Sequence, residues 1–280
     1  MKTLVIRTLT GILFVAAVVG SLLLYDSTPQ FFYLLFLLFS VIGSYELIRM
    51  SENRGHRPNM PIAILLAVIP FSGLALSSFF SGFILSFFLI IAMFLLSAVH
   101  LVIELFRGVR GTLSNVAITY LPVFYVGVPF SLLYTWLSVG AANVVIALFI
   151  ILWTNDTLAY CVGSLLGKHK LCEKISPKKS VEGFVGALVL TVGASVIFQW
   201  IPYFESDMLN TPWRWVGFGL VVVLFGTFGD LIESKFKRSC GVKDSGRFLP
   251  GHGGVLDRFD SALLAIPMAF IYFVLLEFLD

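Results

Sequence analysis

The amino-acid sequence predicts an all-α polytopic membrane protein with about nine transmembrane helices. Two observations support this fold class. The 280 residues are 58% hydrophobic and only 12% charged, a composition that no soluble domain of this length would have. The apolar residues also form long continuous runs, whereas the strands of a membrane barrel would alternate apolar and polar residues over short segments.

The apolar runs define the candidate spans, because a helix needs about 20 mainly apolar residues to cross a bilayer. In chain order they lie at residues 4–24, 31–49, 61–80, 83–106, 116–137, 143–166, 181–201, 214–236 and 261–278. The first run is not followed by an A-x-A-like cleavage pattern, so we expect a retained helix rather than a signal peptide. We predict one membrane domain, with five helices in residues 1–142 and four helices that carry the chemistry in residues 143–280.

The basic residues are distributed unevenly between the loops, and this distribution predicts the orientation. With the N-terminus placed in the cytoplasm, Arg214 alone of the 19 Lys and Arg residues falls on the opposite side. We therefore predict a cytoplasmic N-terminus and a C-terminus on the other side of the membrane. The two cytoplasmic loops 167–183 and 235–260 then contain most of the candidate functional residues.

The eighth span ends in "LFGTFGDLIESKFKR", where acidic residues enter an apolar helix. Helical spacing puts Asp230, Glu233 and Lys237 on one face. Ionisable groups at membrane depth normally face the protein interior or a water-filled cavity. A Glu233–Lys237 ion pair would account for those two residues. It would not account for Asp230, which lies deeper and is therefore a functional candidate.

The ninth span begins with further carboxylates, in "GHGGVLDRFDSALLA". Asp257 and Asp260 lie three residues apart, and capping of a helix N-terminus is their alternative role. Together with Asp230, Asp257 would offer the oxygen ligands of a Mg²⁺ site that holds phosphate oxygens. The neighbouring Lys and Arg residues suit phosphates, and the glycines would let backbone N–H groups approach an anion.

The sixth span, "ILWTNDTLAYCVGSLLGKH", contains Asn155 and Asp156 within apolar sequence. A hydrogen bond between helices would explain Asn155, whereas we expect Asp156 to form a wall of the site. In the loop "ISPKKSVEG", Lys178 and Lys179 either set topology and attract anionic lipid or form a second phosphate clamp. The segment from Ser180 onward resembles a helix start. Glu46, near the end of the second span, is expected at the membrane interface.

The stretch "SKFKRSCGVKDSGRFLPGHGGVLDRFD", from Ser234 to Asp260, resembles the C-terminal signature of the phosphatidate cytidylyltransferase (CDP-diacylglycerol synthase) family. That signature reads S-x-hydrophobic-K-R, four residues, K-D-x-small, two residues, and L-P-x-H-G-G-hydrophobic-x-D-R-hydrophobic-D, and every fixed position is met. "GDLIES", "ISPKKSVEG" and "NDTLAYCVGSLLGKHKL" also look like family segments. The resemblance covers the second half of the chain, and Ser180, where Thr is expected, is a conservative departure.

The resemblance implies the reaction CTP + phosphatidate → CDP-diacylglycerol + diphosphate, with Mg²⁺ as cofactor, in phospholipid biosynthesis. The expected catalytic residues are Asp230, Asp257, Asp260, Lys237 and Arg238. Asp230 and Asp257 are the expected metal ligands, with Glu233 or Asp260 as alternatives for a further one. The expected substrate-binding residues are Asp156, Lys178, Lys179, Ser234, Lys243, Asp244, His252, Gly253, Gly254 and Arg258. The expected partners are CTP, phosphatidate and membrane lipids, without nucleic acid, and a homodimer is left open.

Three other functions are weighed against this one. A CTP-dependent polyprenol or lipid kinase has similar chemistry, and the signature argues against it only by resemblance. A secondary transporter would place its polar site near the bilayer midplane and would often show internal repeats, whereas here the charges gather at one leaflet and no repeat is evident. A non-catalytic scaffold would bind anionic lipids without needing Asp230 and Asp257. We expect a bacterial inner-membrane location with the active site facing the cytoplasm.

Overall fold

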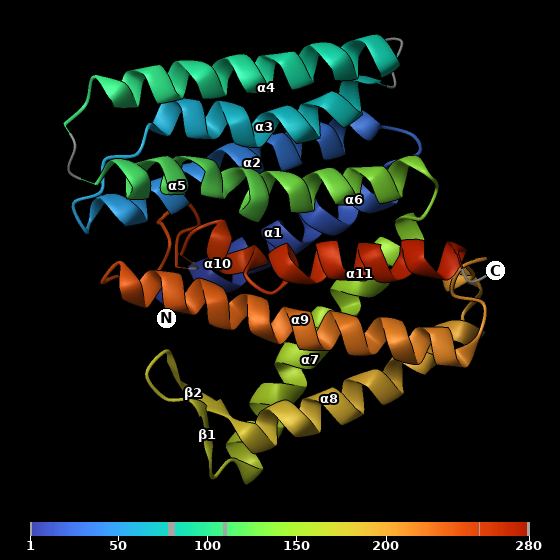
Figure 1. The fold of residues 1–280 in the computed structure, drawn as a ribbon. Coiled ribbons are helices and arrows are strands. Elements are labelled where there is room, and N and C mark those ends of the chain that lie inside the picture. Colours follow the sequence, from blue (N-terminus) through green and yellow to red (C-terminus); the bar gives the residue numbers. More distant parts are fainter. Residues whose placement is uncertain (1, 78–81, 109–110, 252, 279–280) are drawn as a thin grey trace. The chain divides into compact units, whose positions relative to one another are not determined.

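The computed structural model describes residues 2–77, 82–108, 111–251 and 253–278, and these residues are largely helical (Figure 1). The chain divides into two compact units. Unit 1 comprises Met1–Thr135 and Ser239–Arg258, and unit 2 comprises Trp136–Arg238 and Phe259–Asp280. Each unit is therefore built from two stretches that are far apart in the sequence.

The helices of the described residues confirm the predicted fold class. Six stretches are long and apolar enough to cross a membrane: Pro29–Glu52, Phe87–Leu105, Thr112–Ser138, Ala142–Leu166, Val181–Trp200 and Pro212–Ser239. Three shorter apolar helices are Thr8–Leu23, Met60–Gly73 and Ala262–Glu277. Together these helices fall on the nine segments that the apolar runs predicted, which supports an all-α polytopic membrane protein.

Unit 1 contains five complete α-helices, most of a sixth, and residues 239–258 of the signature, which we call the signature loop. The helices are α1 (Lys2–Leu23), α2 (Pro29–Glu52), α3 (Met60–Ser77), α4 (Gly82–Leu105), α5 (Thr112–Pro122) and α6 (Val128–Ser138). A π-helical segment, η1 (Val123–Gly127), joins α5 to α6 directly after Pro122. The short helix α10 (Leu256–Phe259) ends the signature loop at the unit boundary.

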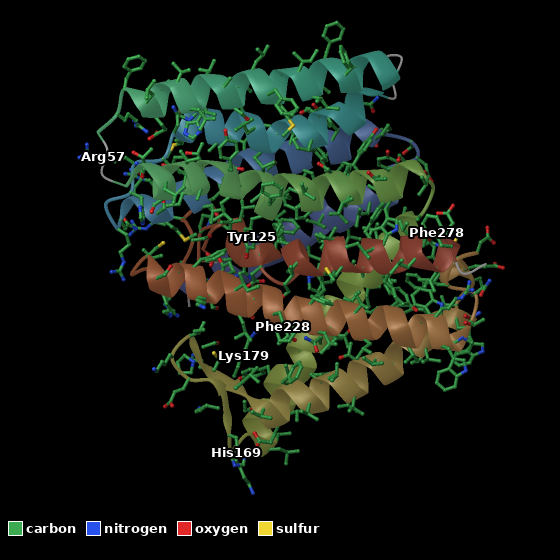
Figure 2. The ribbon with its side chains drawn as sticks, viewed as in Figure 1. Arg57, Tyr125, His169, Lys179, Phe228 and Phe278 are labelled. Atoms are coloured by element: carbon green, nitrogen blue, oxygen red, sulfur yellow. The ribbon has the colours of Figure 1, made fainter. Side chains whose placement is uncertain are left out.

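Close packing holds the helices of unit 1 together. Helix α3 lies between α2 and α4 (Figure 1). Gly127 lets η1 approach α3, because a Cβ at this position would lie 2.2 Å from the Ala67 carbonyl oxygen. Buried aromatic rings fill the interior, and the rings of Phe32 and Phe36 stack with centroids 4.2 Å apart. Side chains also project from the outer side of α4 (Figure 2), where Phe87 and Phe94 are exposed as expected for a lipid-facing surface.

Unit 2 contains four long helices and a small sheet. The helices are α7 (Ala142–Leu166), α8 (Val181–Ser195), α9 (Pro212–Ser239) and α11 (Ala262–Glu277). Two 3₁₀ segments, η2 (Val196–Trp200) and η3 (Pro202–Phe204), follow α8. Helix α9 runs antiparallel to α11, because Gly229 lies against Asp260 and Leu264 while Gly217 lies against Tyr272.

The loop between α7 and α8 forms a β-hairpin, which the sequence did not predict. Its strands are β1 (Lys170–Cys172) and β2 (Ser176–Ser180), paired antiparallel with Lys170 opposite Ser180 and Cys172 opposite Ser176. The strands are only three and five residues long, so they are too short for a period-two pattern to be recognised. The hairpin gives Lys178 and Lys179 a defined backbone just before α8.

Candidate functional site

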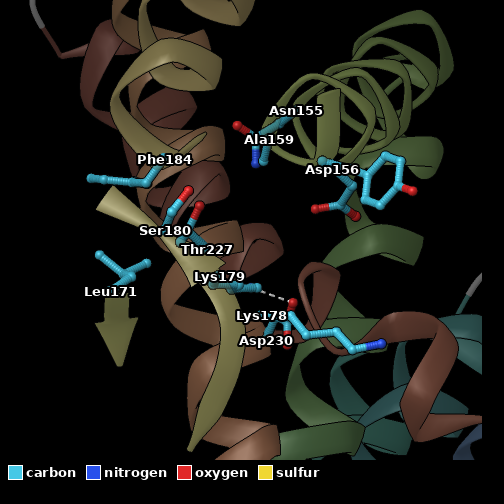
Figure 3. Close-up of a pocket in the computed structure, with 11 residues that line it drawn as sticks. Asn155, Asp156, Ala159, Leu171, Lys178, Lys179, Ser180, Phe184, Thr227 and Asp230 are labelled. Atoms are coloured by element: carbon cyan, nitrogen blue, oxygen red, sulfur yellow. Dashed lines mark hydrogen bonds and ion pairs between the residues drawn. The ribbon is translucent and has the colours of Figure 1, made fainter. Parts of the chain in front are cut away.

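Unit 2 contains a cavity of about 230 Å³. Helices α7, α8 and α9 and the hairpin contribute its walls (Figure 3). The cavity brings together four residues predicted from the sequence: Asp156, Lys178, Lys179 and Asp230. Leu171, Phe184 and Ala159 add apolar surface. The cavity therefore combines charges of both signs with an apolar wall.

Small residues bring α7 and α8 close enough to form this cavity. A Cβ at Gly183 would lie 2.8 Å from the Ala159 carbonyl oxygen and 2.9 Å from the Gly163 Cα. The Ser180 hydroxyl caps α8 by accepting a hydrogen bond of 3.1 Å from the Gly183 N–H. This confirms the predicted helix start. Because β2 ends at the cap, the two preceding lysines lie beside the cavity.

Lys179 and Asp230 form an ion pair across the cavity, from the hairpin to α9. The Ser234 hydroxyl also donates to Asp230 Oδ1, at 3.3 Å. Ser234 was expected to bind substrate, and here it lies one helical turn beyond Asp230 and holds that carboxylate. The ammonium end of Lys178 extends away from the Lys179–Asp230 pair in Figure 3, and Figure 2 shows Lys179 on the hairpin. The two neighbouring lysines therefore differ in their surroundings.

Asp260 lies just before α11 and belongs to the same electrostatic environment. Its pKa is raised to about 7, mainly by burial and in addition by repulsion from Asp230 and Asp156. A hydrogen bond of 2.7 Å from the Ser261 N–H and the positive charge of Lys237 act in the opposite direction. Three carboxylates of unit 2 are thus close enough to repel one another.

This carboxylate arrangement fits Mg²⁺ held jointly by protein and substrate. Within the described ranges, no group of three or more His, Cys, Asp and Glu side chains is close enough to enclose a metal ion. Mg²⁺ commonly uses only one or two carboxylates and completes its shell with water and phosphate oxygens. Asp156 and Asp230 line one cavity, and both repel the carboxylate of Asp260.

Glu233 and Lys237 occupy the buried face of α9 and form an ion pair with each other. This is the pairing that the sequence offered as the alternative to a catalytic role. Arg238 follows in the last turn of α9 and is exposed. Neither Glu233 nor Lys237 lines the cavity, so their part in catalysis remains a prediction.

Unit 1 contains a second cavity, of about 520 Å³, formed by the signature loop. The loop brings together the predicted residues Lys243, Asp244, Gly253 and Arg258. It adds Arg247, which the sequence had not singled out as a site residue. We refer to this second cavity as the basic pocket, because Lys243, Arg247 and Arg258 give it three cations and Asp244 a single anion. His252 lies outside the described residues.

Asp257 organises the signature loop from within. Its Oδ2 accepts hydrogen bonds from the N–H groups of Ser245 and Gly254, at 2.9 and 2.8 Å, and lies 3.1 Å from the Ser245 hydroxyl. The anion that approaches Gly254 is therefore this carboxylate of the protein itself. Gly253 has a φ of +85°, a backbone conformation that residues with a side chain rarely adopt. Asp257 belongs to unit 1 and Asp230 to unit 2, so their sharing of one metal ion stays a prediction.

Sequence reasoning missed Glu46 of α2. It is not simply an interfacial residue, because its side chain is buried and binds the signature loop. The sequence did contain an indication of this role, because Glu46 is a lone carboxylate in an apolar span. The same argument singled out Asp230. Asn155 also lines the unit 2 cavity, and its Oδ1 is buried without a hydrogen-bond donor among the described residues.

A family model described as the cytidylyltransferase family matches residues 5–276. The chain belongs to the cytidylyltransferase family. The match confirms the resemblance that was based on the signature, and it also covers the N-terminal helices. The sequence had indicated these helices only as generic membrane spans.

Similar proteins named phosphatidate cytidylyltransferase occur in several staphylococci. Those of Staphylococcus aureus (strain COL), Staphylococcus saprophyticus and Staphylococcus epidermidis are 44%, 43% and 42% identical to this chain. Each match extends over 159 residues, which are 57% of this chain and 59% of the relative. The chain thus matches about three fifths of the length of these curated relatives.

Proposed function

We propose that this family member is a phosphatidate cytidylyltransferase, which converts CTP and phosphatidate into CDP-diacylglycerol and diphosphate. The observation that carries the proposal is the unit 2 cavity, where Lys178, Lys179, Asp156 and Asp230 meet an apolar wall within a membrane protein. The names of the staphylococcal relatives support the same substrates. CTP and phosphatidate are accordingly the proposed partners.

The cavity suits a lipid that carries a phosphate. Lysine binds phosphate oxygens as a point charge, and the apolar side chains of Leu171 and Phe184 offer surface for the lipid next to its head group. In the other unit, Lys243, Arg247 and Arg258 line the basic pocket. Arginine binds phosphates with two parallel hydrogen bonds, so this pocket suits a polyphosphate.

The reaction needs positioning and charge neutralisation more than acid–base chemistry. A non-bridging oxygen of the phosphatidate phosphate forms a bond to the α-phosphorus of CTP. The bond from that phosphorus to the oxygen that bridges to the β-phosphate breaks, and diphosphate leaves with the bonding electrons. No general base is needed, because a phosphate monoester is already anionic near neutral pH. Lys178 and Lys179 neutralise charge on the phosphates, and Ser234 keeps Asp230 in place.

Asp156, Asp230 and Asp260 are the residues of unit 2 that would hold Mg²⁺, and the role of Asp257 as a metal ligand stays a prediction from the sequence. Bound Mg²⁺ would neutralise phosphate charge and stabilise the leaving diphosphate. Lys179 forms an ion pair with Asp230, so it orients this carboxylate before substrate binds. We further propose that the site faces the cytoplasm of a bacterial inner membrane, because the positive-inside rule predicts that the loops with nearly all Lys and Arg residues are cytoplasmic. A homodimer remains a prediction.

The test uses purified protein in detergent with phosphatidate, Mg²⁺ and CTP labelled at the α-phosphate. We expect label in the lipid fraction, dependent on Mg²⁺ and lost in Asp230→Asn. Absence of lipid label from well-folded wild-type protein would contradict the proposal. A parallel reaction with γ-labelled CTP and a polyprenol would then detect a kinase, which transfers the γ-phosphate instead. Uptake into proteoliposomes would detect a transporter.

A further inference from the structure

The signature loop is bound by Glu46, a residue about 200 positions away in the sequence. Glu46 Oε1 accepts a hydrogen bond from the Val255 N–H, and Oε2 accepts one from the Leu256 N–H, both at 3.0 Å. The Ser245 hydroxyl lies 3.0 Å from the same Oε2. The Glu46 side chain is 3% exposed. All four residues belong to unit 1, so the contact lies within one compact unit.

Two glycines of the loop make room for this carboxylate. A Cβ at Gly246 would lie 2.3 Å from Glu46 Oε1, and a Cβ at Gly254 would lie 2.3 Å from Oε2. Real Cβ atoms do not approach other atoms so closely. The loop therefore folds around the Glu46 carboxylate on both sides. Glycine is needed at these two positions because a side chain would collide with that carboxylate.

Ser245 connects Glu46 to Asp257. The Ser245 hydroxyl lies 3.0 Å from Glu46 Oε2 and 3.1 Å from Asp257 Oδ2, so it can donate to either carboxylate. The Ser245 N–H donates to Asp257. The two carboxylates thus bind neighbouring N–H groups of one short segment, Gly254 to Leu256. Asp257 and the basic-pocket residues Lys243, Arg247 and Arg258 lie on this loop.

We propose that Glu46 is a positioning residue, which fixes the signature loop so that Asp257 and the three cations of the basic pocket are preorganised for phosphate. Its importance for catalysis rests on the proposed cytidylyltransferase function. A buried carboxylate is stabilised only when donors surround it, and here the donors come from the loop itself. The contact therefore stabilises the glutamate and the loop conformation together.

The first arm of the test measures the loop directly. Glu46→Gln preserves the shape of the side chain but turns an N–H₂ group toward at least one of the loop donors. The matched control is Glu104→Gln, because Glu104 is also a buried glutamate of unit 1 but its partners are Arg107 and His100. We expect hydrogen exchange of the Val255 and Leu256 amides to accelerate about tenfold or more in Glu46→Gln, since a hydrogen bond to a charged group is lost. Glu104→Gln should leave these amides unchanged.

The second arm measures phosphate binding with diphosphate as the probe, by calorimetry on the purified protein in detergent. We expect Glu46→Gln to weaken diphosphate binding about tenfold at a nearly unchanged melting temperature, because the cations lose their fixed spacing. Glu104→Gln should bind as the wild type does. If Glu46→Gln does not fold, Ser245→Ala removes the hydroxyl that joins the two carboxylates and should give a smaller loss in the same direction.

The outcomes separate this inference from the proposed function. Accelerated exchange with normal diphosphate binding would show that Glu46 only stabilises the fold and would overturn the positioning role. Unchanged exchange would overturn the contact itself. Failure of the wild type to label lipid from CTP would contradict the proposed function, while the exchange and binding measurements would still decide whether Glu46 organises the basic pocket.

Discussion

Lys179 and Asp230 lie 51 residues apart in the chain and form an ion pair in the cavity of unit 2. Both side chains keep roughly a quarter of their surface exposed, so the pair borders the cavity rather than closing it. A cation and a carboxylate in contact can each exchange its partner for a ligand of opposite charge. Lys179 can turn to a phosphate and Asp230 to a metal ion, which is why this pair is the centre of the proposed site.

The pairing predicts that Lys179→Met and Asp230→Asn will not be additive. Each variant should lower kcat/KM by about 100-fold or more, as removal of a charge that stabilises a transition state does. The double variant should lose much less than the product of the two effects, because the residues act as one unit. Steady-state kinetics with CTP and phosphatidate test this. Asp207→Asn is the control, because Asp207 is an exposed carboxylate of unit 2 outside the cavity. Fully additive losses would contradict coupling.

The raised pKa of Asp260 predicts that the stability of the protein depends on pH in the absence of Mg²⁺. Its pKa is raised to about 7 in the folded protein, against about 3.9 in an unfolded chain. Between these values the folded protein holds a proton that the unfolded chain has released. The stability from this group is therefore fully present below about pH 4 and is lost as the pH rises to 7. Thermal unfolding in a metal chelator should give a melting temperature that falls between pH 5 and pH 7.5. Asp260→Asn should flatten this dependence, and an unchanged slope would contradict the assignment.

Local patterns in the sequence predicted the features that depend on neighbouring residues. The apolar runs gave the helices because span length is a property of the chain itself. Ser180 was placed at a helix start because a cap is a local motif. Asp156 and Asp230 were singled out because a carboxylate in an apolar helix needs an explanation, and both line one cavity.

The features that the sequence could not give depend on contacts between distant segments. Glu46 and Leu256 are 210 residues apart, and no spacing rule relates them. Ser245 occupies a variable position of the signature, yet its hydroxyl lies within hydrogen-bond distance of two carboxylates. The loop glycines were expected to approach a bound anion. They approach the side chains of Glu46 and Asp257 instead, because those carboxylates reach the loop in three dimensions.

Gly254 should be intolerant of even a single methyl group. A Cβ there would lie 2.1 Å from the Ser245 hydroxyl and 2.3 Å from Glu46 Oε2, so Gly254→Ala must displace the loop that carries Asp257. We expect kcat/KM to fall about 100-fold, with the overall helical structure retained in circular dichroism. Gly20→Ala is the control in the same unit, because nothing lies within 4 Å of a Cβ at Gly20. Wild-type activity in Gly254→Ala would show that the loop tolerates the shift.

Gly183 offers a test of how helix packing shapes the unit 2 cavity. A Cβ at Gly183 would lie 2.8 Å from the Ala159 carbonyl oxygen and 2.9 Å from the Gly163 Cα. Gly183→Ala must therefore separate α7 from α8, and overpacking of this kind costs about 1–3 kcal/mol. Gly193→Ala is the matched control in the same helix, because nothing lies within 4 Å of a Cβ there. In this control, alanine favours the helix by up to about 1 kcal/mol.

Both glycine variants of α8 are to be compared by melting temperature in detergent and by kcat/KM for phosphatidate. Gly183→Ala should lower both, because Asp156 lies on α7 while Lys178 and Lys179 directly precede α8. Gly193→Ala should keep wild-type activity with an equal or higher melting temperature. A loss of stability without a loss of activity in Gly183→Ala would mean that the spacing of α7 and α8 does not set the distance between Asp156 and the lysines. The cavity would then have to be maintained by the hairpin and by the Lys179–Asp230 pair.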